Sequence, residues 1–484
     1  MKKNSITKNV TYNLIYQILT VLLPLITTPY LSRKLGSAPI GIYGFTLSIV
    51  TYFVLFGSLG TAMYGQREIA KNESSPKKIS IIFWEITIIR ILAMIISMVA
   101  FYIFFCRNGN YIVYYKLFLI YMVAYTLNIS WFFQGIEQFD RIVIRNIIVK
   151  IVGLLLIFTL IKSPKDLWIY VLIFSGSELL GNISLWFYLP KYLVKTNIKN
   201  VNLKKHIIPV LMLFIPQVAT QIYTVLDKTM VGLITGNMNK VGFYEQAQNI
   251  AKATLVIIAS VQTVMNSRVA KANADGDKKE IKECLRKSFD FVWMLGIPMM
   301  LGVICVAGNL VPWYFGKGFE PVKNILIATS PIIIVIGLSG ITGIVYLIHT
   351  GQQKPFTTSV IIGAFINVIL NFILINIFGT IGAAISSVIA EVSILLFHFK
   401  YIKKAYKISD IFKVSTKPII SGIIMFAVVF PISLLLKPSI INTGILTIIG
   451  AVVYTLCLYI LKYELLLNTL EIGLKILKLN KKKS

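Results

Sequence analysis

The sequence ISIIFWEITIIRILAMIISMVAFYIFF occupies residues 79–105, and only Glu85 and Arg90 in it carry a charge at neutral pH. About 20 apolar residues are enough to cross a hydrocarbon core of roughly 30 Å as an α-helix. A backbone in lipid must also satisfy its own hydrogen bonds, which a helix does. The stretch therefore predicts a membrane-spanning helix.

Stretches of the same kind recur along the chain and are separated by short connections. Together they predict an all-α integral membrane protein with about 14 transmembrane helices. No long segment is left over that could fold as a separate soluble domain. The expected spans are residues 11–31, 41–63, 79–105, 112–134, 142–163, 167–189, 207–235, 242–267, 288–307, 322–348, 356–376, 379–399, 416–436 and 440–461.

Lysine and arginine are distributed unevenly over the connections. The formal net charge is +29, and most of the 48 basic residues lie in every second connection, beginning with the N-terminal segment. Short loops rich in Lys and Arg stay in the cytoplasm, so both termini are expected to be cytoplasmic. This distribution explains the charge without nucleic acid, because a nucleic-acid binder gathers its basic residues on one face of a soluble domain. Attraction to anionic membrane lipids is the simpler role for it, and recruitment of an anionic substrate is the alternative.

Cysteine and histidine are sparse. The four cysteines are isolated and the three histidines lie far apart, so we expect no disulfide framework, no metal site and no cofactor. The first apolar run is interrupted by Gln17, Pro24 and Pro29, which favours a retained helix over a signal peptide. Residues 463–484 combine spaced leucines with lysines, as in a basic helix that lies in the membrane surface.

Two parts of the chain echo one another. PIGIYGFTLSI at residues 39–49 and KVGFYEQAQNI at residues 240–250 stand at the start of the second and eighth spans. Six spans per repeat is an even number, so the repeats would be parallel and related by a pseudo-two-fold axis along the membrane normal. We therefore expect an N-terminal lobe at residues 1–205, a second lobe at 206–413, two additional spans at 414–462 and the tail at 463–484.

Four charged residues fall near the middle of expected spans: Arg90, Glu178, Lys252 and Glu391. Each costs about 2.5–3.5 kcal/mol at the bilayer centre and usually faces protein or water. Two interpretations stay open, a structural ion pair inside each lobe or the walls of a hydrated cavity. Three more charged residues are expected nearer the interfaces, where side chains can extend to water; they are Glu85, Lys150 and Glu245.

The span at residues 207–235 carries one polar stripe on an otherwise apolar helix. Gln217, Gln221 and Asp227 belong to it at helical spacing, with Lys228 beside them. The first span repeats the pattern with Gln17 and, just after its end, Arg33. Such stripes indicate either a water-filled path or polar contacts between helices.

Five strings in this order carry a resemblance to a known family. They are PLITTPYLSRKLG (24–36), YGQREIAKN (64–72), WFFQGIEQ (131–138), LDKTMVGLITG (226–236) and VGFYEQAQNI (241–250). The chain closely resembles the polysaccharide transporter family, the Wzx-type flippases of O-antigen, capsule and exopolysaccharide repeat units. The resemblance implies the fold of the multidrug/oligosaccharidyl-lipid/polysaccharide exporter superfamily, in which two six-helix lobes form a V around a cationic cavity and two helices are added.

The resemblance also implies a cargo, an undecaprenyl-diphosphate-linked oligosaccharide that moves from the inner to the outer leaflet of the bacterial plasma membrane. A diphosphate requires positive charge, and arginine adds bidentate geometry. The candidate substrate-binding residues are Arg33, Arg90, Lys252, Gln17, Gln217 and Gln221. The candidate coupling residues, for H⁺ or Na⁺, are Asp227, Glu178 and Glu391. Expected partners are the lipid-linked substrate, membrane lipids and, as further candidates, a polysaccharide polymerase and other assembly proteins.

Two other functions are the alternatives. A cation-coupled small-molecule or multidrug exporter of the same fold would favour an acidic, aromatic cavity, and the basic excess at depth argues against it. A membrane glycosyltransferase or polymerase needs a catalytic acid cluster or a sizeable outer loop, and the outer connections are short. We therefore expect a transporter working by alternating access, and not an enzyme.

Overall fold

The computed structural model describes residues 6–195, 202–403 and 405–471, except for the side chains of parts of α1 and α9. The regular secondary structure of these residues is helical. A π-helix, Ile341–Ile348, follows α13 directly. The α-helices are α1 (Ile6–Leu35), α2 (Ser37–Ser58), α3 (Thr61–Lys71), α4 (Pro76–Phe105), α5 (Ile112–Thr126), α6 (Ser130–Gly135), α7 (Phe139–Leu160), α8 (Leu167–Trp186), α9 (Lys204–Thr235), α10 (Met238–Ala274), α11 (Lys278–Phe315), α12 (Pro321–Thr329), α13 (Ile332–Gly340), α14 (Gln353–Phe378), α15 (Thr380–Ile402), α16 (Ile408–Lys413), α17 (Thr416–Leu435) and α18 (Ile440–Ile460).

The all-α membrane fold expected from the sequence is confirmed. In the described part of the chain, 12 helical segments are long and apolar enough to cross a membrane, and they coincide with the second to sixth and the eighth to fourteenth expected spans. The first and seventh expected spans lie in α1 and α9, of 30 and 32 residues, which are not among these 12. The total of about 14 therefore stays a prediction.

The chain divides into two compact units, Met1–Glu245 and Gln246–Ser484. Unit 1 contains α1 to α9 and the start of α10, and unit 2 contains the rest of α10 and α11 to α18. The helix α10 thus belongs to both. The lobes expected at residues 1–205 and 206–413, and the parallel repeats, remain predictions.

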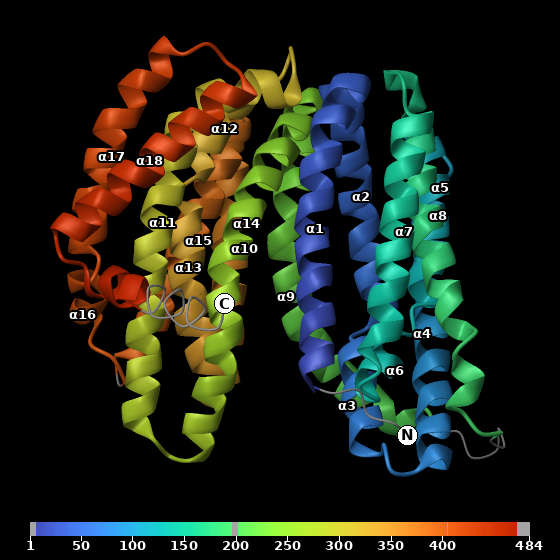
Figure 1. Cartoon of the computed structure of the whole chain (residues 1–484). Helices are drawn as coiled ribbons and strands as arrows, with labels where there is room; N and C mark the ends of the chain where they lie inside the picture. Colours follow the sequence, from blue (N-terminus) through green and yellow to red (C-terminus); the bar gives the residue numbers. More distant parts are fainter. Residues whose placement is uncertain (1–5, 196–201, 404, 472–484) are drawn as a thin grey trace, which may run out of the picture. The chain divides into compact units, whose positions relative to one another are not determined.

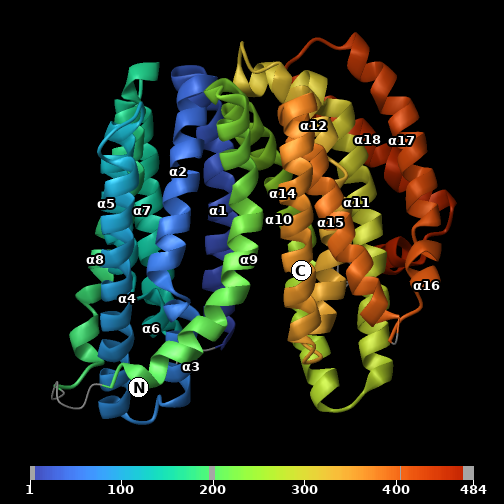
Figure 2. The ribbon, with the colours of Figure 1, turned by 180° about the vertical axis from the view of Figure 1, so that it is seen from behind.

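In unit 1, drawn from two sides in Figure 1 and Figure 2, α2 packs against α4, α5 and α9, and α1 packs against α7. Near one end of this unit the short helices α3 and α6 meet. The Trp131 ring stacks on Phe83 with centroids 5.7 Å apart, and a Cβ added to Gly65 would lie 2.4 Å from that Trp131 ring. The strings at residues 64–72 and 131–138 therefore pack directly on one another.

Glu85 of α4 forms a buried polar latch with the start of α9. Its carboxylate is 0% exposed and lies 2.9 Å from Lys205 Nζ and 2.7 Å from His206 Nε2. The backbone N–H of Asn202 donates to the same carboxylate at 2.7 Å, and the Tyr64 hydroxyl lies 2.8 Å from His206 Nδ1. Glu85 was expected to extend to water, and this expectation is wrong because the chain brings its partners to it.

In unit 2, α17 and α18 pack on each other and on α11 (Figure 2). The indole N–H of Trp293 in α11 donates to the carbonyl of Ile411 at 2.9 Å. Beside the π-helix, His398 of α15 is 1% exposed, with Nδ1 2.9 Å from Thr342 Oγ1 and Nε2 2.7 Å from Ser359 Oγ. The end of the expected tail, residues 472–484, lies outside the described residues.

Candidate functional site

Three consecutive residues of α9 hold the polar cluster that forms the candidate functional site: Asp227, Lys228 and Thr229. Successive residues of an α-helix point about 100° apart, so each side chain meets a different partner. Asp227 is buried, and its Oδ2 accepts a hydrogen bond of 2.6 Å from the hydroxyl of Tyr244 in α10. Lys228 forms an ion pair with Glu245, the next residue of α10.

Helix α2 supplies the third side of this cluster. Thr229 Oγ1 lies 2.7 Å from Ser48 Oγ and 3.3 Å from the Tyr52 hydroxyl. A Cβ added to Gly44 would lie 3.2 Å from Glu245 Oε2, so a larger residue at this position would press on the carboxylate. The strings at residues 39–49, 226–236 and 241–250 therefore converge on one polar cluster of α2, α9 and α10.

The cluster combines two carboxylates and one ammonium group among apolar helices. Removing one partner of a buried ion pair lowers the free energy of unfolding by several kcal/mol, because the other charge is then uncompensated. Lys228 is engaged in this way by Glu245. Asp227, the second carboxylate of the cluster, accepts a hydrogen bond from the Tyr244 hydroxyl.

A second polar site in unit 1 lies beside the ring of Tyr43, the neighbour of Gly44 in α2. Its centroid lies 4.7 Å from the ring of Tyr170 and 5.7 Å from that of Phe174, both in α8. These two rings line a pocket of about 210 Å³ between α1, α7 and α8, together with Lys150 and Glu178. Glu178, a residue predicted to take part in coupling, thus shares a pocket with a basic residue of the same unit.

The basic residues predicted to bind substrate belong to three different helices, α1, α4 and α10. Arg90 is buried, its Nε donates to Thr61 Oγ1 at 2.9 Å, and its Nη1 donates to the carbonyl of Asn128. These bonds tie the start of α3 to the end of α5. Arg33 is exposed in the last turn of α1, and Lys252 is exposed on the part of α10 that belongs to unit 2.

The remaining predicted residues belong to α1, α9 and α15. Gln217 and Gln221 are half-buried on α9, whereas the side chain of Gln17 lies outside the described residues. Glu391 of α15 is buried in unit 2 and accepts a hydrogen bond of 3.1 Å from the Ser339 hydroxyl. The structure thus gives each residue an environment, and the transport roles of all of them stay predictions.

Sequence reasoning missed Tyr244 and Glu245 as members of the site. Glu245 was expected to extend to an interface, but its side chain is only 14% exposed and is held by Lys228. The signal that could have found it is the glycine-rich start of the second span. Gly41 and Gly44 mark a helix face on which another backbone or a polar group can come close.

Comparison with known families and proteins gives matches over most of the chain. A family model described as "Polysaccharide biosynthesis protein" matches residues 6–265, and one described as "Lipid II flippase MurJ" matches residues 189–454. A putative O-antigen transporter of Escherichia coli K12 is 25% identical over 394 residues, which cover 80% of this chain and 94% of the relative. A probable low-salt glycan biosynthesis flippase of Haloferax volcanii, Agl15, is 23% identical over 240 residues, 48% of this chain and 49% of that relative.

Solved structures share the fold. A lipid II flippase MurJ in an inward closed conformation has a TM-score of 0.75 at 18% identity, covering 94% of this chain and 99% of its own. An inward-facing multidrug resistance transporter of the MATE family has a TM-score of 0.64 at 12% identity, covering 81% and 98%. At these identities the similarity shows the fold alone.

Proposed function

The chain belongs to the polysaccharide biosynthesis protein family, and from this premise we propose that it is a flippase for lipid-linked oligosaccharides. The observation that carries the proposal is the family match over residues 6–265, which includes the whole polar cluster of α2, α9 and α10. A relative aligned with most of the chain is named a putative O-antigen transporter, and another is named a glycan biosynthesis flippase.

Moving such a cargo requires polar side chains inside the membrane, and this chain has them. A sugar headgroup does not cross hydrocarbon unaided, because its hydroxyl groups would lose their hydrogen bonds to water. Polar side chains inside a helical membrane protein can replace those bonds. A flippase therefore needs no catalytic residues, and the proposal is for a transporter and not an enzyme.

The finer proposal concerns the cargo, the direction and the membrane. The cargo is an undecaprenyl-diphosphate-linked repeat unit of O-antigen, capsule or exopolysaccharide, moved from the cytoplasmic to the outer leaflet of the bacterial inner membrane. The alternating charge of the connections supports cytoplasmic termini. Arg33 and Lys252, both exposed, are each proposed to contact the diphosphate at some stage of its passage, and Arg90 holds Thr61 of α3 and Asn128 beyond the end of α5.

Coupling is proposed to act through α10. Asp227 and the ion pair of Lys228 hold the start of this helix, and the same helix continues into unit 2. Binding of H⁺ or Na⁺ at Asp227 would weaken the bond from Tyr244 and change how α10 is held, which is one physical route to alternating access. Glu178 and Glu391 are the second and third candidates for this role.

The proposal is tested in a strain that lacks the gene and carries it on a plasmid. Surface polysaccharide and lipid-linked oligosaccharide are measured together. We expect deletion to abolish the polysaccharide and to accumulate lipid-linked units that face the cytoplasm. Normal amounts of both, or efflux of small cationic drugs with no effect on polysaccharide, would contradict a flippase and favour a small-molecule exporter.

The coupling residues are tested in the same strain by single amide variants. Asp227→Asn is expected to lower polysaccharide export about tenfold, equivalent to about 1.4 kcal/mol, at unchanged protein level. Asp410→Asn in α16 is the control, because that carboxylate is 33% exposed and its ion pair with Lys413 lies at the surface. Full export by the amide variants of Asp227, Glu178 and Glu391 alike would remove the coupling proposal.

A further inference from the structure

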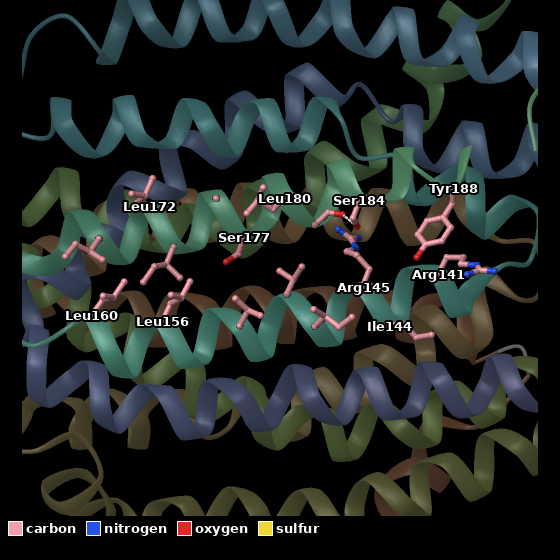
Figure 3. A pocket seen from close by; sticks show the side chains of 17 residues that line it. Arg141, Ile144, Arg145, Leu156, Leu160, Leu172, Ser177, Leu180, Ser184 and Tyr188 are labelled. Atoms are coloured by element: carbon pink, nitrogen blue, oxygen red, sulfur yellow. Dashed lines mark hydrogen bonds between the residues drawn. The ribbon is translucent and has the colours of Figure 1, made fainter. Parts of the chain in front are cut away.

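A groove with a volume of about 580 Å³ runs between α7 and α8 of unit 1 (Figure 3). One face of each helix lines it, at spacings of three and four residues that keep side chains in register along a helix. It extends from Leu160 of α7 at one end to Arg141 of α7 and Tyr188 beyond α8 at the other. Its side chains change from apolar to basic along this length.

The apolar part of the groove is open because its floor is made of small residues of α8. A Cβ added to Gly176 would meet no atom within 4 Å, and Ser177 and Gly181 continue the floor. The walls are aliphatic and exposed, with Ile148 57% and Leu180 68% accessible. A membrane protein that exposes such a channel offers a hydrocarbon chain a longer contact than a flat surface would.

The other end of the groove carries two arginines, one helical turn apart on α7. Arg145 Nη1 donates to Asn182 Oδ1 at 2.9 Å and Nη2 to Ser130 Oγ at 3.3 Å, which fixes this guanidinium between α6 and α8. The guanidinium of Arg141 lies over the Tyr188 ring at 4.8 Å. Arginines held in this way present planar donors that match phosphate oxygens.

The length of the groove distinguishes between lipids. From residue 141 to residue 160, α7 rises by about 28 Å at 1.5 Å per residue, which nearly equals the roughly 30 Å hydrocarbon core. An ordinary acyl chain ends near the middle of the bilayer and would fill about half of this length. A polyprenyl chain is long enough to occupy all of it.

We propose that the α7/α8 groove binds the polyprenyl chain of a phosphate-bearing carrier lipid, with the phosphate at Arg141 and Arg145. The basic end of the groove follows the connection between α6 and α7, one of those expected to be cytoplasmic. The carrier is therefore held while it lies in the cytoplasmic leaflet. The choice of a polyprenyl lipid rests on the proposed function, whereas the groove and its arginines do not.

The test measures binding of undecaprenyl diphosphate to the full-length protein in detergent, with phosphatidylglycerol and undecaprenol as comparison probes. Gly176→Leu adds a side chain to the groove at a position where its Cβ meets no atom within 4 Å, and we expect it to weaken binding about tenfold. Gly302→Leu in α11 is the matched control, because a Cβ there also meets no atom within 4 Å. Arg141→Gln should weaken binding of the diphosphate about fivefold and leave undecaprenol unchanged, with Lys162→Gln beyond the opposite end of α7 as the control for loss of one charge.

Each outcome decides one point. Wild-type affinity in both Gly176→Leu and Arg141→Gln would overturn the proposal, and so would equal affinity of the groove for phosphatidylglycerol, which would make it an ordinary phospholipid site. Loss of binding in Gly176→Leu, together with transport-inactive wild-type protein in liposomes, would contradict the proposed function and leave the groove supported. Active transport by a Gly176→Leu variant that still binds the carrier normally would overturn the groove and leave the function supported.

Discussion

The buried polar clusters at Glu85 and Lys228 in unit 1 and the cluster at His398 in unit 2 satisfy their polar groups in different ways. In unit 1, Glu85 meets Lys205 and His206, and Lys228 meets Glu245, so charge faces opposite charge. In unit 2, the His398 ring lies within hydrogen-bond distance of the Thr342 and Ser359 hydroxyls, and Glu391 accepts a hydrogen bond from the Ser339 hydroxyl. Breaking a buried ion pair costs about 3–5 kcal/mol, and losing one neutral hydrogen bond costs about 1 kcal/mol. The two clusters of unit 1 are thus expected to depend on individual charges more than the His398 cluster of unit 2 does.

The largest expected effect is that of Glu85→Ala. The variant leaves Lys205, His206 and the N–H of Asn202 without their shared acceptor, which should lower the apparent free energy of unfolding by about 4 kcal/mol in a titration with SDS. Glu68→Ala, in the same unit, removes ion pairs to the exposed Arg67 and Lys71 and should cost less than about 1 kcal/mol. Equal losses in the two variants would contradict the latch.

Lys228→Met is expected to come next, at about 3 kcal/mol in the same titration, because it removes the ion-pair partner of the Glu245 side chain, which is only 14% exposed. Adding Glu245→Gln should recover about half of that loss, since the double variant removes both charges. If the double variant loses as much stability as Lys228→Met and Glu245→Gln lose separately, added together, the ion pair contributes nothing and the contrast between the units disappears.

Gly343→Ala tests unit 2, where space and not charge is expected to be limiting. The new Cβ would lie 2.6 Å from His398 Cε1 and 3.1 Å from the Phe356 ring, so the methyl group should cost about 2 kcal/mol by overpacking. Gly444→Ala in α18 is the control, because its Cβ would meet no atom within 4 Å. If Gly343→Ala were as stable as the control, the side chains around His398 would have moved to make room for the methyl group, and space would not be limiting there.

The smallest effect is expected for Ser359→Ala, which removes one hydroxyl from the His398 ring at the unit 2 network. The loss should be about 1 kcal/mol, the value of one neutral hydrogen bond, again measured by SDS titration. A loss as large as that of Glu85→Ala would mean that unit 2 depends on single polar groups as strongly as unit 1, and the comparison would fail.

Hydropathy and local strings were sufficient for the fold class and the family. Residues 79–105 are apolar over a full membrane thickness, and the strings near residues 226–236 and 241–250 lie inside the family match. The polar stripe of the span at residues 207–235 also drew attention to Asp227 and Lys228, which the structure places against Tyr244 and Glu245 of α10.

The partners of the buried charges could not be read from the sequence. Glu85 and His206 are separated by 121 residues, and nothing local to either shows that the fold will bring them together. Depth along a helix suggested that Glu85 and Glu245 would extend to water, but burial depends on which neighbour covers that face. The groove between α7 and α8 is likewise a property of two helix faces and not of either one.

The beginnings of α2 and α10 touch backbone to backbone. A Cβ at Gly41 would lie 2.7 Å from the Met238 carbonyl carbon, and one at Gly242 would lie 3.0 Å from that of Ser37. Two non-bonded carbon atoms prefer about 3.5–4.0 Å, so any side chain at either position must push the helices apart. Substitutions at Gly41 and Gly242 are therefore expected to be poorly tolerated, although neither residue has a functional group. A loss of function in such variants would report on the spacing between the helices and not on recognition of cargo.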